Sequence, residues 1–432
     1  MRRTFIVCGL LYIAIYAFEG AVRYFLHLAG ADDAIFVRDA LLILPCLGLF
    51  AVQASRLRVH PAFLAFGAII AVHGALMMAN LRSYEAVAYG IKLLMGELFG
   101  FIAGGLLVAP GRRTRRFLEL VLFVSVVGIL LDKWVLSFPW EGMSTHIGGL
   151  KVAISTDWET GNGIAKRVAG FTRVSIAAAI LIPVLTLLVV PRLRSGLLRM
   201  LMLAVALGVV FLTTQKGAVL ALLPVAAVFL MPRRWRFPLL GVLCTVFALL
   251  DVLLPIVTDG MVIGDSGGVF SMASFAMRVI ITWPDAWHWI LLHQIFPLGV
   301  GLGGIGGAMR LYAPNFMNPA DNMFLFLYAW FGIFGIAYLA WVLVTFWRTP
   351  GEAREAMLPA AAILTFLIGY GTVLSLLEDP FAALFVGAAT GAMWQARQRV
   401  RGRVWADSFA PVVPDVYAEP GIPAAAPSRR AA

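Results

Sequence analysis

The sequence predicts an all-α, polytopic membrane protein, and three observations lead to that prediction. Hydrophobic residues make up 61% of the 432 residues and charged residues only 13%, far outside the range of soluble domains. Apolar stretches long enough to cross a hydrocarbon core of about 30 Å recur from end to end. They are continuous rather than alternating, which indicates helices and not barrel strands.

Short basic loops separate these stretches and indicate about twelve membrane-spanning helices. The segment Met1–Arg3 is the charged start of the first helix, which we predict to be uncleaved because no small-residue cleavage site follows it. All the basic loops fall on one side, so the positive-inside rule places both termini in the cytoplasm. The predicted helices cover about 4–24, 34–54, 61–80, 87–109, 117–136, 169–190, 197–213, 217–231, 237–256, 321–346, 357–377 and 380–396.

Two longer polar loops are predicted on the outer side, over about 137–168 and 257–320. The middle of the second loop is apolar and rich in tryptophan but interrupted by charges, which is typical of helices lying in the membrane interface. Residues 1–404 would form the membrane domain. Residues 405–432 are rich in Pro and Ala, and we predict a disordered cytoplasmic tail there.

Several kinds of site are excluded by the sequence. Cys8, Cys46 and Cys244 all lie in predicted spans without metal-ligand spacing, so neither a disulfide framework nor a metal site is expected. The net charge of +11 is concentrated in the basic loops, which indicates topology and not nucleic-acid binding. The glycine-rich segment 296–307 follows no strand and is not a dinucleotide site, so no cofactor is expected. Its glycines would let the backbone approach a ligand or another helix closely.

Some charges in the predicted spans have partners nearby in the sequence. Arg38 is next to Asp39, and Glu19 precedes Arg23 by one helical turn. We expect these four residues to pair with one another, along one helix end or between the first two helices, because an unpaired charge in a span costs about 2.5–3.5 kcal/mol on insertion scales.

Other cations lack such partners and lie toward the outer face. Lys216 occupies a tight turn with no nearby acid, Arg167 and Arg173 flank the place where the first outer loop re-enters the membrane, and Arg278 and Arg310 belong to the second loop. Guanidinium forks and a lysine charge are suited to phosphate recognition. They would provide counter-charge for a pyrophosphate at the membrane surface, and anion permeation is the competing use.

Four segments in order resemble the O-antigen polymerase and ligase superfamily, the Wzy and WaaL proteins. They are "KRVAGFTRVSIAAA", "LTTQKGAVLAL", "MRVIITWPDAWHWILLHQIFPLGVGLGGIG" and "DNMFLFLYAWFGIFGIAYL", within about residues 160–345. The resemblance implies a GT-C-like, metal-independent glycosyltransferase. It would act on sugar chains carried by undecaprenyl pyrophosphate at the periplasmic face of a bacterial inner membrane, beside a chain-length regulator and a flippase.

The resemblance also assigns roles to residues. Arg167, Lys216 and Arg278 would hold the donor pyrophosphate, and many relatives have His-Asn where this chain has Asp321-Asn322. The ligases rely on that histidine, so its absence favours a polymerase of lipid-linked repeat units. A ligase that transfers the glycan to a lipid or protein, and a polysaccharide transporter or flippase, are the alternatives.

Asp321 is the expected general base, because glycosyl transfer to a hydroxyl needs a group that accepts its proton. A partly desolvated carboxylate at the mouth of an apolar helix would have a raised pKa. The alternative is that Asp321 caps that helix. Asp285, His288 and His293 are the reserve bases. The residues expected to contact substrate are Arg173, Asn322, Arg310, His288 and His293.

Overall fold

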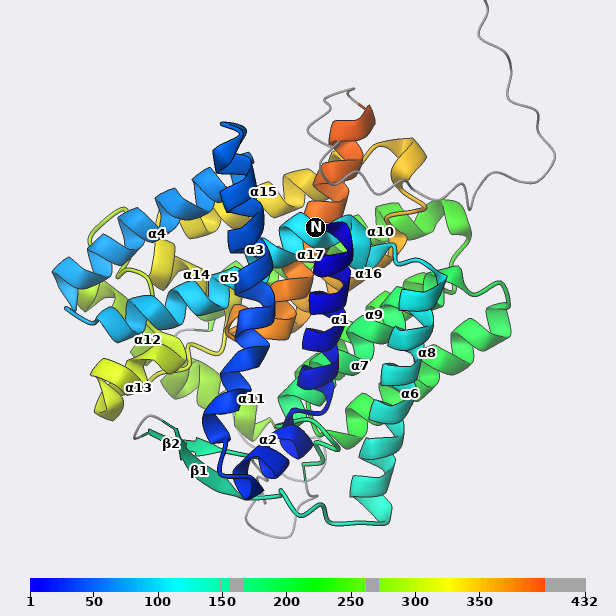
Figure 1. Cartoon of the computed structure of the whole chain (residues 1–432), viewed down its shortest axis with the longest axis horizontal. Coiled ribbons are helices and arrows are strands. Elements are labelled where there is room, and N and C mark those ends of the chain that lie inside the picture. The colour runs from blue at the N-terminus through cyan, green and yellow to red at the C-terminus, as the bar shows by residue number, and fades with distance from the viewer. Residues whose placement is uncertain (148–149, 156–166, 259, 262–271, 401–432) are drawn as a thin grey trace, which may run out of the picture.

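The computed structural model of the chain describes residues 1–147, 150–155, 167–258, 260–261 and 272–400. The predicted tail over 405–432 lies outside the described residues, as do residues 156–166 of the first outer loop and 262–271 of the second. The described residues are overwhelmingly helical, as predicted, with one small hairpin in which strand β1 (Ser144–Ile147) pairs antiparallel with strand β2 (Leu150–Ala153). The hairpin lies beside α2 at the bottom of Figure 1.

The helices of the first third precede this hairpin. They are α1 (Arg2–Ala17), α2 (Glu19–Leu28), the short η1 (Asp32–Phe36), α3 (Val37–Ser55), α4 (Pro61–Asn80), α5 (Tyr84–Val108) and α6 (Arg112–Trp134). In Figure 1 the start of α1 and the last turns of α17 lie toward the upper part of the view, away from α2.

The remaining helices follow the hairpin. They are α7 (Ser175–Val189), η2 (Val190–Arg192), α8 (Gly196–Leu212), α9 (Lys216–Val228), α10 (Arg233–Val257), α11 (Ala273–Met277), the π-helical η3 (Arg278–Thr282), α12 (Trp283–His293), η4 (Gly306–Ala308), α13 (Met309–Tyr312), η5 (Pro314–Phe316), α14 (Met323–Phe331), α15 (Ile333–Trp347), η6 (Gly351–Ala353), α16 (Leu358–Gly371), η7 (Leu376–Glu378) and α17 (Pro380–Val400).

Among the described residues, five helices are long and apolar enough to cross a membrane. They are Asp32–Ser55, Pro61–Asn80, Tyr84–Val108, Ser175–Arg192 and Arg233–Val257, and the bent pair α1–α2 adds a sixth if it counts as one span. This is the pattern of an all-α membrane protein. The layout with about twelve spans stays a prediction.

Two helices predicted as continuous are broken. The helix predicted over 4–24 bends by 81° where α1 ends and α2 begins. The helix predicted over 321–346 is divided at Gly332, which has a φ of 56°. A Cβ at Gly332 would lie 2.0 Å from the Pro297 carbonyl oxygen. The break therefore depends on a close approach that hydropathy does not reveal.

Glycines bring α5 and α17 into close contact at the centre of the fold. A Cβ at Gly100 would lie 2.0 Å from the Leu384 carbonyl oxygen, and one at Gly387 would lie 2.1 Å from that of Glu97. Such small residues allow helices in membranes to pack backbone against backbone. This contact fixes the beginning of α17, which belongs to the candidate site described below.

The glycine-rich segment 296–307 packs against α4 and α5. A Cβ at Gly301 would lie 2.7 Å from the Met77 backbone nitrogen, and one at Gly303 would lie 2.5 Å from the Ala86 carbonyl oxygen. Both glycines have positive φ angles, 119° and 87°. The predicted close approach to another helix is confirmed.

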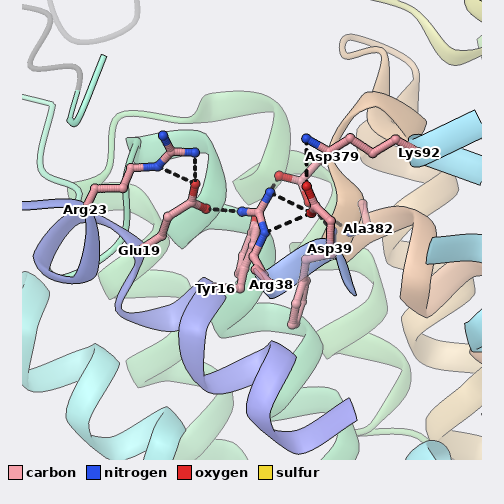
Figure 2. A network of polar contacts seen from close by, with 9 residues as sticks. Tyr16, Glu19, Arg23, Arg38, Asp39, Lys92, Asp379 and Ala382 are labelled. Carbon is pink, nitrogen blue, oxygen red and sulfur yellow. Dashed lines mark hydrogen bonds and ion pairs between the residues drawn. The ribbon is translucent and has the colours of Figure 1, made fainter. Parts of the chain in front are cut away.

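The charges expected to pair do so in one network, shown in Figure 2. Glu19 accepts ion pairs from Arg23 at 2.7 Å and from Arg38 at 2.6 Å. Asp39 pairs with Arg38 at 3.2 Å and with Lys92 of α5 at 2.8 Å. The network joins α2, α3 and α5, so both predicted pairs are confirmed, and Glu19 with Arg38 closes a further pair between helices.

Candidate functional site

The candidate site is centred on an ion pair between Arg278 and Asp321. The Nε atom of Arg278 lies 3.2 Å from Oδ2 of Asp321. Arg278 opens the π-helical η3, and its Nη1 donates to the backbone oxygen and the hydroxyl of Ser274 at 3.0 and 2.6 Å. Single π-helical turns are frequent at functional sites because they re-aim side chains. Here the turn directs a guanidinium toward a carboxylate 43 positions further along the chain.

The backbone before α14 adopts an unusual conformation. Ala320 and Asp321 have φ angles of 60° and 46°, which non-glycine residues rarely adopt. The Asn318 side chain holds this turn, since it accepts from the Ala320 N–H at 2.7 Å and donates to the Thr282 carbonyl at 2.8 Å. The Trp283 indole donates to the Asp321 carbonyl at 3.3 Å. Local strain of this kind is maintained by surrounding contacts and clusters at functional sites.

The residue that caps α14 is Asn322 and not Asp321. The Oδ1 atom of Asn322 accepts from the Leu325 N–H at 2.9 Å, and its Nδ2 donates to the carbonyls of Asp251 and Thr372. An N-cap needs extended backbone, which Asn322 has at φ −162° and Asp321 does not. The capping alternative for Asp321 is therefore wrong. Asn322 is fully buried and holds three elements together, and its expected contact with substrate stays a prediction.

Two effects act in opposite directions on the pKa of the Asp321 carboxyl. Burial raises its pKa, and the Arg278 guanidinium beside it opposes that rise. The raised pKa expected from partial desolvation is confirmed in direction. The sequence did not predict this ion pair. The pair stabilises the ionised carboxylate, and a general base loses that form when it accepts a proton.

Tyr370 connects Asp321 and Arg278 with two other segments that carry predicted cations. Its hydroxyl donates to Oε1 of Gln215 at 3.2 Å, and it interacts electrostatically with Arg278, Asp321 and Arg167. Gln215 directly precedes Lys216, the exposed first residue of α9. The half-buried Arg167 has an Nε atom without a hydrogen-bond partner among the described residues. Segments far apart in the chain thus lie near Tyr370, and their joint role in a substrate site stays a prediction.

Arg173 and Arg310 lie near each other at the same site. Each interacts electrostatically with Tyr89 of α5, and Arg173 also interacts with Arg310 and with Glu19. Burial lowers the pKa of the Arg173 guanidinium. Arg310 is exposed, and its Nε donates to the Met317 sulfur at 3.3 Å. The site therefore borders the Glu19 network and extends to α13.

The three reserve bases make no hydrogen bond or ion pair with Asp321 or Arg278 among the described residues. Asp285 and His288 are exposed on α12. His293 ends that helix, stacks on Trp289 with ring centroids 3.9 Å apart and contacts the Trp289 carbonyl through Nδ1 at 3.0 Å. Within the described ranges, neither histidine forms a hydrogen bond with Asp321 or Arg278. Those same ranges contain no group of three or more potential metal ligands.

Two acidic residues at this site were not singled out from the sequence. Glu378 and Asp379 precede α17, and Glu378 interacts electrostatically with Asp321 and Arg310. Asp379 caps α17 by accepting from the N–H groups of Phe381 and Ala382, and it also accepts from the Tyr16 hydroxyl at 2.6 Å (Figure 2). The signal was present, since "EDPFAALF" places two acidic residues before an apolar helix, as "ADNMFLF" places one.

Comparison of the chain with known protein families and with curated proteins finds no match.

Proposed function

We propose that this protein is a polymerase of oligosaccharide repeat units carried on undecaprenyl pyrophosphate, acting at the periplasmic face of a bacterial inner membrane. The observation that carries the proposal is the convergence of Arg167, Arg278 and the Lys216 turn around Tyr370 and Asp321. The four segments that resemble the O-antigen polymerase and ligase superfamily contain Arg167, Lys216, Arg278 and Asp321.

The proposed reaction transfers a growing glycan to the next unit. A hydroxyl oxygen of the acceptor sugar forms a bond to the anomeric carbon of the donor, and the bond from that carbon to the phosphate oxygen breaks. The electron pair leaves with undecaprenyl diphosphate, and the hydroxyl proton passes to a carboxylate. Negative charge develops on the leaving oxygen, and cations fixed in a partly dehydrated site stabilise it in the transition state.

Arginine suits this task because its planar fork binds two phosphate oxygens at once. Arg278 is held in place by Ser274 and Asp321, so its fork is oriented before a ligand arrives. A preoriented cation loses less side-chain entropy on binding than a mobile one. The partners of this reaction are the lipid-linked donor and acceptor, membrane lipids, a chain-length regulator and a flippase.

A ligase is the second candidate, and a transporter of the lipid-linked units is the third. A strain that lacks this gene separates the three by the lipid-linked glycans it accumulates. Single repeat units on the periplasmic side are expected for a polymerase. Full-length lipid-linked chains would identify a ligase, and single units trapped on the cytoplasmic side would identify a flippase.

Binding of undecaprenyl diphosphate tests the cationic cluster directly. The purified full-length protein in lipid nanodiscs should bind this lipid. Arg278→Ala should weaken binding by at least tenfold, because a charge-assisted, bidentate contact is lost. Arg115→Ala is the matched control, since Arg115 lies on α6 in a predicted cytoplasmic loop and pairs with Glu119 at 3.3 Å. Equal loss in both variants would indicate non-specific attraction to the phosphates.

A further inference from the structure

Glu378 has the surroundings of a functional carboxylate. It ends η7, the short helix between α16 and α17, and its side chain is partly exposed. The Gly307 N–H donates to its Oε1 atom. Among the described residues it has no ion pair, whereas Asp321 is paired with Arg278.

The glycine-rich segment leaves room for this carboxylate. Gly306 has a φ of 90°, and a Cβ on it would lie 2.2 Å from Oε1 of Glu378. A Cβ on Gly307 would lie 2.8 Å from the Tyr89 hydroxyl oxygen. Any side chain at position 306 would therefore displace the carboxylate, and the two glycines form a cradle for it.

The loop that carries Glu378, between α16 and α17, is hydrogen-bonded to the segment that carries Asp321. The Ser375 hydroxyl donates to the Pro319 carbonyl, and Asn322 donates to the Thr372 carbonyl at 3.1 Å. Glu378 and Asp321 repel each other electrostatically, and Arg310 of α13 attracts Glu378. The two carboxylates therefore belong to one site, but among the described residues it is Asp321 that forms an ion pair.

This difference separates their chemical roles. A carboxylate paired with an arginine stays ionised but is a weaker proton acceptor, because protonation breaks the pair. Burial raises the pKa of the Glu378 carboxyl to about 7, and the nearby charge of Asp321 adds to the rise while the Gly307 N–H and Arg310 oppose it. A pKa near the working pH is the favourable range for general base catalysis.

We propose that Glu378 is the general base of the glycosyl transfer and that Asp321 is a positioning residue that orients Arg278. The inference rests on the proposed function and replaces the expectation that Asp321 accepts the proton. Glu378 takes the proton from the acceptor hydroxyl as its oxygen bonds to the anomeric carbon, and Arg278 faces the departing diphosphate.

The experiment compares Glu378→Gln with Asp321→Asn in the full-length protein in nanodiscs. The substrate is the lipid-linked units extracted from the deletion strain. Glu378→Gln keeps the acceptor for Gly307, so it should retain its melting temperature and bind undecaprenyl diphosphate within about twofold. Its polymerisation rate should fall by on the order of 10²–10⁴, the usual contribution of a general base. Glu85→Gln, the same change at an exposed position of α5, should polymerise normally.

Asp321→Asn should weaken diphosphate binding and retain measurable polymerisation, because Arg278 is misplaced but the base remains. A normal rate for Glu378→Gln would overturn the assignment. So would loss of all polymerisation in Asp321→Asn with undiminished diphosphate binding. If Glu378→Gln does not fold, Glu378→Asp decides, since an unchanged rate and pH profile for that variant also refutes it. A wild-type protein that neither polymerises nor binds the diphosphate refutes the proposed function itself.

Discussion

Two neighbouring groups of charged residues in this protein differ in how their charges are balanced. The Glu19 network consists of Glu19, Arg23, Arg38, Asp39 and Lys92, and its members join in a continuous chain of ion pairs (Figure 2). The Asp321 cluster consists of Arg167, Arg173, Lys216, Arg278, Arg310, Asp321 and Glu378. It has five cations and two carboxylates, against three cations and two carboxylates in the Glu19 network, and its central ion pair is Arg278 with Asp321.

The difference distinguishes a structural use of buried charge from a functional one. In the Glu19 network each carboxylate lies between two cations, so the burial cost of every charge is offset inside the protein. In the Asp321 cluster the cations exceed the carboxylates among the described residues, and a bound anion would add counter-charge. An excess of this kind among the described residues is what the proposed diphosphate ligand would complement. The following predictions test this distinction, from the largest expected effect to the smallest.

Arg38→Ala should destabilise the protein by about 3–5 kcal/mol, because Glu19 and Asp39 each lose a buried partner. Arg38 is almost completely buried and pairs with both carboxylates. The measurement is the thermal unfolding midpoint in detergent. Arg38→Lys, which keeps the charge, should recover part of the loss. An unchanged unfolding midpoint for Arg38→Ala would show that the Glu19 network does not stabilise the folded protein.

Arg278→Ala should lower polymer formation by on the order of 10²–10³, the usual loss when one donor to a developing charge is removed. Its unfolding midpoint should stay close to that of the wild type, since Arg278 pairs with a single, partly exposed carboxylate. Arg278→Lys should rescue only part of the activity because the fork is lost. The readouts are polymer length by electrophoresis and protein abundance in the membrane. Normal polymer from Arg278→Ala would place it outside the site.

The polymerisation rate should depend on the protonation of Glu378. Its pKa is raised to about 7, and a base acts only when deprotonated, so the rate should rise by up to about tenfold per pH unit below pH 7 and level off above it. In Glu378→Gln the rise of the rate with pH below pH 7 should disappear.

The stability of the folded protein should change with pH in the opposite direction. The folded protein retains a proton that the unfolded chain releases near its ordinary pKa of 4.5, so the contribution of Glu378 falls as pH rises toward 7.

Lys92→Ala should have the smallest effect, below about 1 kcal/mol, because partly exposed ion pairs contribute little. Lys92 is the outermost member of the Glu19 network, and its side chain is 33% exposed. Its removal leaves Asp39 paired with Arg38. The unfolding midpoint and polymer length should both remain near wild type. A loss of stability as large as that of Arg38→Ala would mean that the contribution of each ion pair does not depend on how deeply it is buried.

Short-range pairing could be predicted from the sequence, and long-range pairing could not. Glu19 and Arg23 are four positions apart on one helix, so their contact follows from helix geometry. Arg38 adjoins Asp39, so their charges are close in any conformation. Glu378 reaches Gly307 across 71 positions. No local pattern encodes such a distance. The acidic pair at 378–379 was visible, but its place beside Asp321 depends on how α16, α17 and the glycine-rich segment pack.

The helix cap shows the same limit. From the sequence, Asp321 was the expected alternative cap for α14, because an aspartate side chain accepts hydrogen bonds from backbone N–H groups. The backbone gave that role to Asn322. Asp321 has a φ of 46°, and the Asn318 side chain and Trp283 hold that turn. Asn322 is extended and caps the helix, and Asp321 is left to pair with Arg278.

The sequence by itself determined the all-helical class, the apolar character of the helices and which charges lack a local partner, because these depend on composition and on neighbours within a few positions. Only the tertiary structure decided where helices break, which residue caps α14 and which carboxylate pairs with Arg278. These features depend on atoms brought into contact from distant segments, as at Gly332 against Pro297 and Gly306 against Glu378. Contacts of that kind arise from packing, which no local pattern specifies.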